Sequence, residues 1–104
     1  MPYSIEYSPD AEDHLLFLTA RQQAIVLDTV DEQLTHQPTV ETRNRKPMRP
    51  NPLAPWELRI GTLRVYYDVE DAPEPKVYIR AVGQGLKSGI AYALQEQSLS
   101  YEDH

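Results

Sequence analysis

The chain has 104 residues, no cysteine and a formal net charge of −6, and 40% of its residues are hydrophobic. This length and composition fit a single domain (residues 1–104) with one core, and they exclude wholesale disorder. The lack of cysteine excludes disulfides, thiolate metal sites and cysteine nucleophiles. No apolar run is long enough to span a bilayer, and the N-terminal residues lack the basic and apolar regions of a signal peptide. We therefore expect a cytoplasmic protein that does not bind membranes.

Residues 3–7 alternate apolar and polar side chains, which predicts a short strand. Ser8 can then cap a helix that runs to about residue 20. Thr19-Ala20-Arg21-Gln22 fits a capping box for a second helix, which we expect to run to about His36. The buried stripe of this second helix is predicted to consist of Gln23, Val26, Leu27, Val30 and Leu34. Two helices joined this closely form an αα-hairpin.

Residues 39–55 are predicted to form a long loop. Four prolines in this segment exclude a helix or a central strand. The loop is longer than most connections within a domain, which is typical of functional loops. It also carries most of a basic cluster: residues 43–64 contain six basic residues and one acidic residue, in a chain that is otherwise acidic. Such a cluster is either a solvated surface or the binding site of an anionic partner. The loop residues that we expect to contact such a partner in the second case are Arg43, Arg45, Lys46 and Arg49.

Residues 56–69 are predicted to form a β-hairpin, because Trp56–Ile60 and Leu63–Val69 alternate strictly and Gly61-Thr62 supply a turn. Trp56 is assigned to the edge of the core. The face opposite the core is expected to carry Glu57, Arg59, Arg64, Tyr66 and Asp68. A last strand over residues 76–82 is predicted to bury Val77, Ile79 and Ala81 and to expose Tyr78 and Arg80. A helix over residues 90–97 and a frayed tail over residues 98–104 complete the chain.

This order of elements predicts an α+β fold. We expect an antiparallel sheet of three or four strands, with the N-terminal αα-hairpin packed on one face. The opposite face then carries the arginines and tyrosines of the strands.

Arg59 and Arg64 are expected to lie close together on neighbouring strands of this outer face. Two guanidinium groups repel each other unless an anion lies between them, and arginine binds a phosphodiester with paired donors. The alternative is that Glu57 and Asp68 neutralise the two arginines in ordinary surface ion pairs.

Tyr66 and Tyr78 on the same face could stack on unpaired bases, although tyrosine is also common in half-exposed strands. The three histidines share no spacing typical of a metal site, and no phosphate-binding glycine motif is present. We expect neither a metal nor a cofactor.

Three stretches of the sequence resemble the RelE/ParE toxin superfamily. They are Trp56-Glu57-Leu58-Arg59-Ile60-Gly61, Leu63-Arg64-Val65-Tyr66-Tyr67-Asp68-Val69, and Val77-Tyr78-Ile79-Arg80-Ala81-Val82-Gly83. Arg45-Lys46-Pro47 and a helical hairpin that ends at Pro38 also fit, so the resemblance extends to about Ser88. It implies the fold described above.

The resemblance also implies a function, which is that of the toxin in a type II toxin–antitoxin system. RelE-type members are ribosome-dependent endoribonucleases (mRNA interferases) that inhibit translation. They cut mRNA without a metal, by driving the ribose 2′-hydroxyl onto the adjacent phosphate. ParE-type members inhibit DNA gyrase. The expected partners are a cognate antitoxin and, for an active enzyme, the ribosome and mRNA. The alternative is a binding module without catalysis, either a gyrase inhibitor or an inactive homologue that only binds its antitoxin.

Matched to the RelE pattern, Arg59 and Arg64 would stabilise the charge that develops on the phosphate. Glu57 stands where RelE has a lysine, and it is a candidate base for the 2′-hydroxyl proton. Lys87 and Tyr92 are candidate acids, although Tyr92 is displaced by one residue from the expected tyrosine. Tyr66, Tyr78 and Arg80 complete the RNA-binding candidates, together with the basic loop residues.

Two departures from the pattern bear on activity. Gln84-Gly85 replace residues that are usually basic in the superfamily, and the chain is acidic overall where members are commonly basic. Both departures keep the non-catalytic alternative open.

Overall fold

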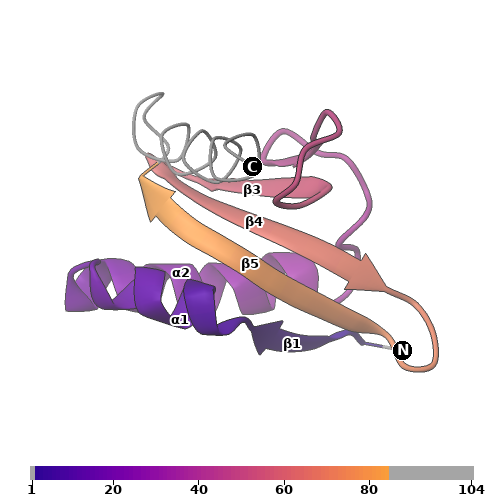
Figure 1. The fold of residues 1–104 in the computed structure, drawn as a ribbon, viewed down its shortest axis with the longest axis horizontal. Helices are drawn as coiled ribbons and strands as arrows, with labels where there is room; N and C mark the ends of the chain where they lie inside the picture. Colours follow the sequence, from indigo (N-terminus) through magenta and orange to yellow (C-terminus); the bar gives the residue numbers. More distant parts are fainter. Residues whose placement is uncertain (1, 85–104) are drawn as a thin grey trace, which may run out of the picture.

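The computed structural model describes residues 2–84, which form two helices and a five-stranded sheet. Figure 1 shows the elements in chain order: β1 (Ser4–Tyr7), α1 (Pro9–Leu16), α2 (Ala20–Leu34), β2 (Arg45–Pro47), β3 (Trp56–Ile60), β4 (Leu63–Glu70) and β5 (Lys76–Gln84). Among these residues no helix is long and apolar enough to cross a membrane. The predicted helix over residues 90–97 and the tail over residues 98–104 lie outside the described part.

The strands are arranged in the order β1-β5-β4-β3-β2. Strands β2 to β5 pair antiparallel, and β1 pairs parallel with β5, with Ser4 opposite Lys76 and Tyr7 opposite Ile79. The predicted α+β fold, with its helical hairpin packed on one face of the sheet, is confirmed, but the sheet is mixed rather than antiparallel because of the parallel β1–β5 pair. The sheet has five strands instead of the predicted three or four, because Arg45–Pro47, which were predicted to be part of a loop, form the short edge strand β2 next to β3. Pro47 has no amide hydrogen to donate, so it suits an edge strand.

Both helices begin where their capping residues predict. Ser8 Oγ accepts a hydrogen bond from the Ala11 amide at 3.0 Å and caps α1. At the start of α2, Thr19 Oγ1 accepts from the Gln22 amide at 3.1 Å, and Gln22 Oε1 accepts from the Thr19 amide at 3.0 Å. This capping box satisfies backbone donors that have no partner within the helix. Only a short turn separates the end of α1 from the start of α2, so the predicted αα-hairpin forms.

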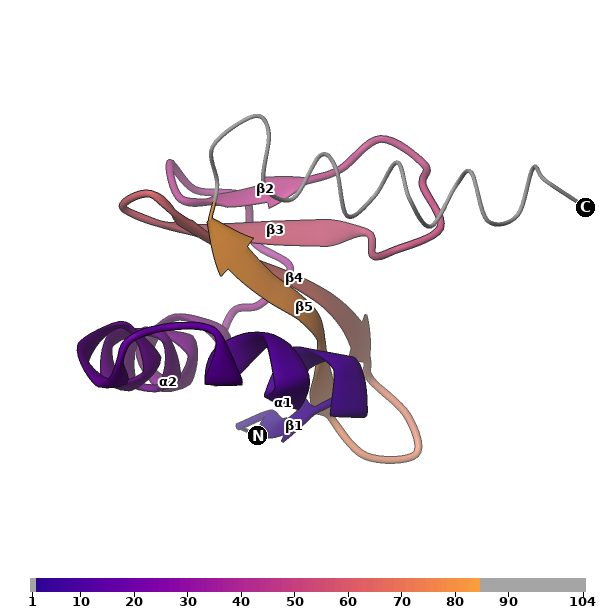
Figure 2. The same cartoon turned by 60° about the vertical axis from the view of Figure 1, so that its left-hand side comes forward.

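The core lies between the helical hairpin and one face of the sheet (Figure 2). Helix α2 contributes Val26, Val30 and Leu34, which follow one another at intervals of four residues and are fully buried. The prediction that Leu27 is buried was wrong, since 41% of this residue is exposed. Leu27 lies about 100° further around the helix than Val26, which turns it away from the sheet.

A β-bulge changes the orientation of side chains along β5. Tyr66 pairs with Ala81 and Tyr67 pairs with Ile79, so Arg80 is an extra residue between them. Such an insertion shifts the alternation of a strand by one residue. Beyond the bulge, Val82 therefore faces the core, and Ala81 packs on the opposite face with Tyr66. The predicted inward orientation of Ala81 was wrong for this reason.

The face of the sheet opposite the helices is partly covered by the loop of residues 48–55. A second, smaller apolar cluster forms there from Ala54, Tyr66 and Ala81, with Met48 and Leu53 packed against it. Asn51 fixes the conformation of the loop. Its Oδ1 accepts from the amides of Leu53 and Ala54 at 2.8 and 3.0 Å, and its Nδ2 donates to the carbonyls of Arg49 and Ala54. The long loop is thus an ordered part of the outer face.

Candidate functional site

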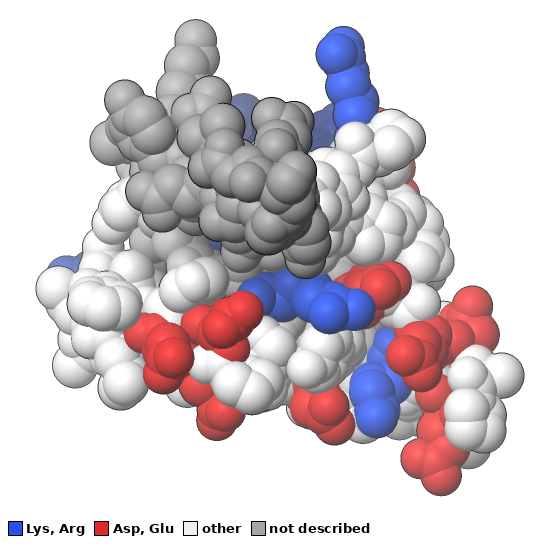
Figure 3. All heavy atoms as spheres, in the orientation of Figure 1, with Lys and Arg blue, Asp and Glu red and all other residues white. Residues whose placement is uncertain are grey.

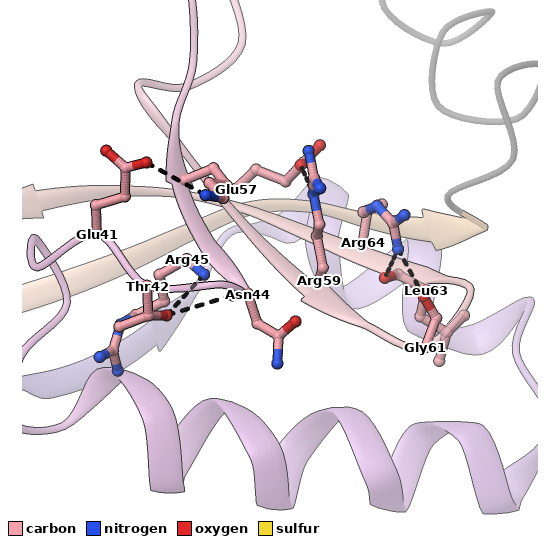
Figure 4. Close-up of polar contacts among 10 residues, drawn as sticks. Glu41, Thr42, Asn44, Arg45, Glu57, Arg59, Gly61, Leu63 and Arg64 are labelled. Atoms are coloured by element: carbon pink, nitrogen blue, oxygen red, sulfur yellow. Dashed lines mark hydrogen bonds and ion pairs between the residues drawn. The ribbon is translucent and has the colours of Figure 1, made fainter.

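The arginines of the β3–β4 hairpin lie directly opposite each other on the outer face of the sheet. The strand register pairs Arg59 with Arg64, and Figure 4 shows the two side chains next to each other. This is the placement that the alternation of the two strands predicts. Two guanidinium groups at a cross-strand pair repel each other unless a negative charge compensates them.

One of the two positive charges is compensated within the protein. Glu57 Oε1 lies 2.8 Å from Arg59 Nε, and the Glu57 side chain is only 14% exposed, compared with 47% for Arg59. Glu57 is therefore held in a fixed, half-shielded position beside the arginine pair. The surface ion pair that the sequence left open as an alternative does form, but it involves only Arg59.

Arg64 is held by backbone carbonyl groups. Its Nη1 donates to the carbonyls of Gly61 and Leu63, both at 2.8 Å, and no carboxylate among residues 2–84 forms an ion pair with it. These two hydrogen bonds use both hydrogens of Nη1. Nε and Nη2 form the edge of a guanidinium that binds a phosphate with two parallel hydrogen bonds, and in Arg64 they have no partner in the described region.

Tyr66 lies beside this group, opposite Glu57 in the strand register. Burial, together with the negative charge of Glu57, raises the pKa of the Tyr66 hydroxyl well above its usual value, although the positive charges of Arg64 and Arg59 oppose the shift. Tyr66 is only 5% exposed because the 48–55 loop packs over it. Its ring is thus covered in this structure and is not presented for stacking on a base.

The basic loop residues do not gather on one surface. Arg45 is buried, and its guanidinium donates to the Val40 carbonyl at 3.0 Å and to the backbone and side-chain oxygens of Gln33 at 2.6 and 3.3 Å. Arg45 therefore ties β2 to the end of α2. Lys46 pairs with Glu41 at 3.2 Å, whereas Arg43 and Arg49 are exposed.

Tyr78 and Arg80 lie further along the same face. Arg80 Nη2 is 3.6 Å from Asp68 Oδ2, and the Arg80 guanidinium lies 4.7 Å from the centre of the Tyr78 ring. One face of this ring is thus occupied by the arginine. A cavity of about 410 Å³ lies beside them, lined by residues 48–55, Asp68 and Arg80. No cavity was predicted here, and the one local signal for it is Asn51 between two prolines, which is typical of a turn.

Lys87 and Tyr92, the two candidate acids, lie outside the described residues. Within residues 2–84, no group of three or more histidine, aspartate or glutamate side chains could hold a metal ion. The surface in Figure 3 carries many acidic side chains, over the helices and around the turn after β4, and few basic ones. The hairpin arginines are therefore a local positive feature of an acidic molecule.

No protein-family model matches the chain, and no curated protein is significantly similar to it. Among solved structures, it is similar to one chain of the toxin–antitoxin complex RelBE2 from Mycobacterium tuberculosis. The two share 27% sequence identity with a TM-score of 0.69, over 81% of this chain and 99% of the other. The fold and the strand motifs of residues 56–83 lead to the same conclusion, which is that the chain resembles the toxins of the RelE/ParE superfamily.

Proposed function

We propose that this chain is the toxin of a type II toxin–antitoxin pair and that it inhibits translation in the cytoplasm as a ribosome-dependent mRNA endoribonuclease. The toxin assignment is supported by the similarity to a chain of a toxin–antitoxin complex. The observation that carries the RNA-cleaving activity is the Nε/Nη2 edge of Arg64, which has no partner in the described region and lies opposite Arg59.

The proposed reaction needs no metal. The 2′-hydroxyl of one nucleotide attacks the adjacent phosphorus, and the bond from phosphorus to the 5′-oxygen of the next nucleotide breaks. Negative charge increases on the phosphate oxygens in the transition state. Arg64 would bind these oxygens through two parallel N–H groups, which are already positioned by the carbonyls of Gly61 and Leu63.

Glu57 is the proposed base. Its carboxylate is fixed by Arg59 at 2.8 Å and lies next to the proposed phosphate position, so it could accept the 2′-hydroxyl proton. Arg59 would then serve mainly to position Glu57. Lys87 and Tyr92 remain candidates for the acid that protonates the leaving oxygen.

Arg64→Ala tests the activity directly. The protein would be expressed without antitoxin, growth arrest would be scored, and the 5′ ends of cellular mRNA would be mapped by primer extension. We expect Arg64→Ala to lower cleavage by about a hundred- to a thousand-fold, as the loss of one charge-stabilising donor typically does. Arg21→Ala, an exposed change on α2, is the matched control and should cleave like the wild type. Equal cleavage by wild type and Arg64→Ala would refute this role.

A second candidate function is a binding module without catalysis. It is supported by the Glu57–Arg59 ion pair, which neutralises one of the two hairpin cations, and by the net charge of −6. Such a protein would act by inhibiting gyrase or only by binding its antitoxin. A wild-type protein that neither arrests growth nor creates new mRNA ends would favour this function. A supercoiling assay with purified gyrase would then separate an inhibitor from an inactive homologue.

A further inference from the structure

The cavity between the 48–55 loop and the sheet has two different walls. The loop wall combines three prolines and Leu53 with the polar residues Arg49 and Asn51, whereas the sheet wall is formed by the charged side chains of Asp68 and Arg80. Its volume of about 410 Å³ falls within the range of roughly 300 to 1,000 Å³ that is usual for small-molecule sites. Apolar side chains combined with a few polar groups are the common composition of such sites.

Asp68 and Arg80 keep unused hydrogen-bonding capacity. Asp68 Oδ1 accepts from the Val69 amide at 2.8 Å, and Asp68 Oδ2 lies 3.6 Å from Arg80 Nη2, which is too long for a good hydrogen bond. The two side chains are 41% and 44% exposed. The guanidinium is also held by its contact with the Tyr78 ring. A carboxylate acceptor and a guanidinium donor are thus presented side by side at the cavity.

This cavity shares a face with the proposed phosphate site. Arg64, Tyr66 and Asp68 occupy alternate positions of β4 and therefore lie on the same side of the sheet. Asp68 is four residues from Arg64, which is about 13 Å along a strand. A single-stranded RNA that places one phosphate at Arg64 could therefore place a nearby base at the cavity.

We propose that the cavity binds a guanine base. Guanine presents two neighbouring donors, N1–H and the N2 amino group, which match the two oxygens of a carboxylate. It also presents two neighbouring acceptors, O6 and N7, which match a guanidinium. The other three bases do not offer both pairs. The flat base would pack against the prolines of the loop. The identification of guanine-containing RNA as the biological ligand rests on the proposed function, whereas binding of the base itself does not.

The test is a titration of the full-length, ¹⁵N-labelled protein with guanosine monophosphate, followed by the amide signals of residues 48–55 and 68–80. The adenosine, cytidine and uridine monophosphates and ribose 5-phosphate are titrated in parallel. We expect saturable shifts with guanosine monophosphate and an affinity for the other compounds that is at least about five-fold weaker. Equal affinity for all four nucleotides, or for ribose 5-phosphate, would overturn the proposal.

Asp68→Asn keeps the size of the side chain but removes its charge and one acceptor. It should weaken binding of guanosine monophosphate by about five- to a hundred-fold, as the loss of a two-point base contact does. Arg21→Ala, on the helical side of the protein, should leave binding unchanged. Unchanged binding by Asp68→Asn would mean that the Asp68 carboxylate does not recognise the base. The proposal would then fail even if nucleotides bind.

The outcome is separable from that of the proposed function. If the nucleotide binds selectively while mRNA ends stay unchanged on expression, the cavity assignment stands and the ribonuclease assignment falls. If mRNA is cleaved but no nucleotide is preferred in the titration, the ribonuclease assignment stands and the cavity assignment falls.

Discussion

At the scale of single residues, the arginine pair of the outer face combines an Arg64 edge without a partner among residues 2–84 and a Glu57 carboxylate fixed by Arg59. Glu57→Gln keeps the shape of the side chain but removes its basicity and weakens its ion pair with Arg59. If Glu57 is the base, we expect a loss of about a hundred-fold or more in cleavage on ribosomes. If it only neutralises Arg59, activity should be unchanged or should increase, because one negative charge beside the phosphate is gone. Mapping of mRNA ends with purified ribosomes separates the two outcomes.

A second residue of interest is Tyr7, whose hydroxyl is buried without a hydrogen-bond partner in the described region. Burial, with a smaller effect of the negative charge of Asp31, raises the pKa of Tyr7 to about 12. A buried polar group without a partner lowers stability, so Tyr7→Phe should raise the free energy of unfolding by about 1 kcal/mol. Urea denaturation at pH 7 measures this, and a clear loss of stability would contradict it.

The raised pKa also predicts how stability depends on pH. An unfolded tyrosine loses its proton near pH 10, whereas folded Tyr7 keeps its proton to about pH 12. Below pH 10 Tyr7 is protonated in both states, so its effect on stability does not depend on pH. As the pH rises from 10 to about 12, the unfolded state loses the proton first, and the free energy of unfolding of the wild type falls. The advantage of Tyr7→Phe over the wild type should thus increase between pH 10 and pH 12. Equal pH profiles for the two proteins would argue against the shift.

At the scale of elements, the 48–55 loop depends on one side chain. Asn51 makes hydrogen bonds to three residues of its own loop, and the loop packs on Tyr66 and Ala81. Asn51→Ala should lower the free energy of unfolding by about 1–3 kcal/mol, because partly buried backbone groups lose their partners. Asn44→Ala is the control, since the Asn44 side chain is exposed and makes no hydrogen bond to residues 2–84. Its effect should stay within about 0.5 kcal/mol.

Those elements that depend on neighbouring residues could be predicted from the sequence. The two capped helices and the β3–β4 hairpin follow from caps, a turn and alternation, all of which are visible within a few residues. The placement of Arg59 opposite Arg64 followed from the same information. These features were predictable because their stabilising contacts are short in sequence.

What could not be predicted depends on contacts between distant segments. The bulge at Arg80 reverses Ala81, and only the pairing of β5 with β4 reveals it. Tyr66 is covered because the loop folds back on the sheet. Arg45 is buried because β2 pairs with β3 and brings its guanidinium to the end of α2. None of these contacts leaves a local pattern in the sequence.

At the scale of the whole molecule, the charge is unevenly distributed. Residues 43–64 are basic, whereas the rest of the chain is acidic. We expect an antitoxin to cover this region with an acidic segment in an extended or helical conformation. Arg43, Arg49 and Arg64 would supply most of the attraction, because Arg45 is buried and Lys46 and Arg59 already have acidic partners.

An interface of this kind should weaken as salt rises, since the Debye length shortens from about 10 Å at 0.1 M to about 3 Å at 1 M. The measurement is a pull-down of the chain with the product of the small gene beside its own, repeated at increasing salt. Arg43→Ala combined with Arg49→Ala should reduce both the affinity and its salt dependence, whereas Arg21→Ala should change neither. Failure to recover a complex at low salt would contradict the assignment of an antitoxin partner.

The parallel pairing of β1 with β5 has a consequence for how the protein is made. Residue 4 lies opposite residue 76, so the first strand has no partner until most of the described chain has been synthesised. Closing so long a loop is slow compared with forming a helix or a hairpin. While the chain is still attached to the ribosome, the helical hairpin has only part of its sheet to pack on, and the finished toxin fold appears only after β5 emerges.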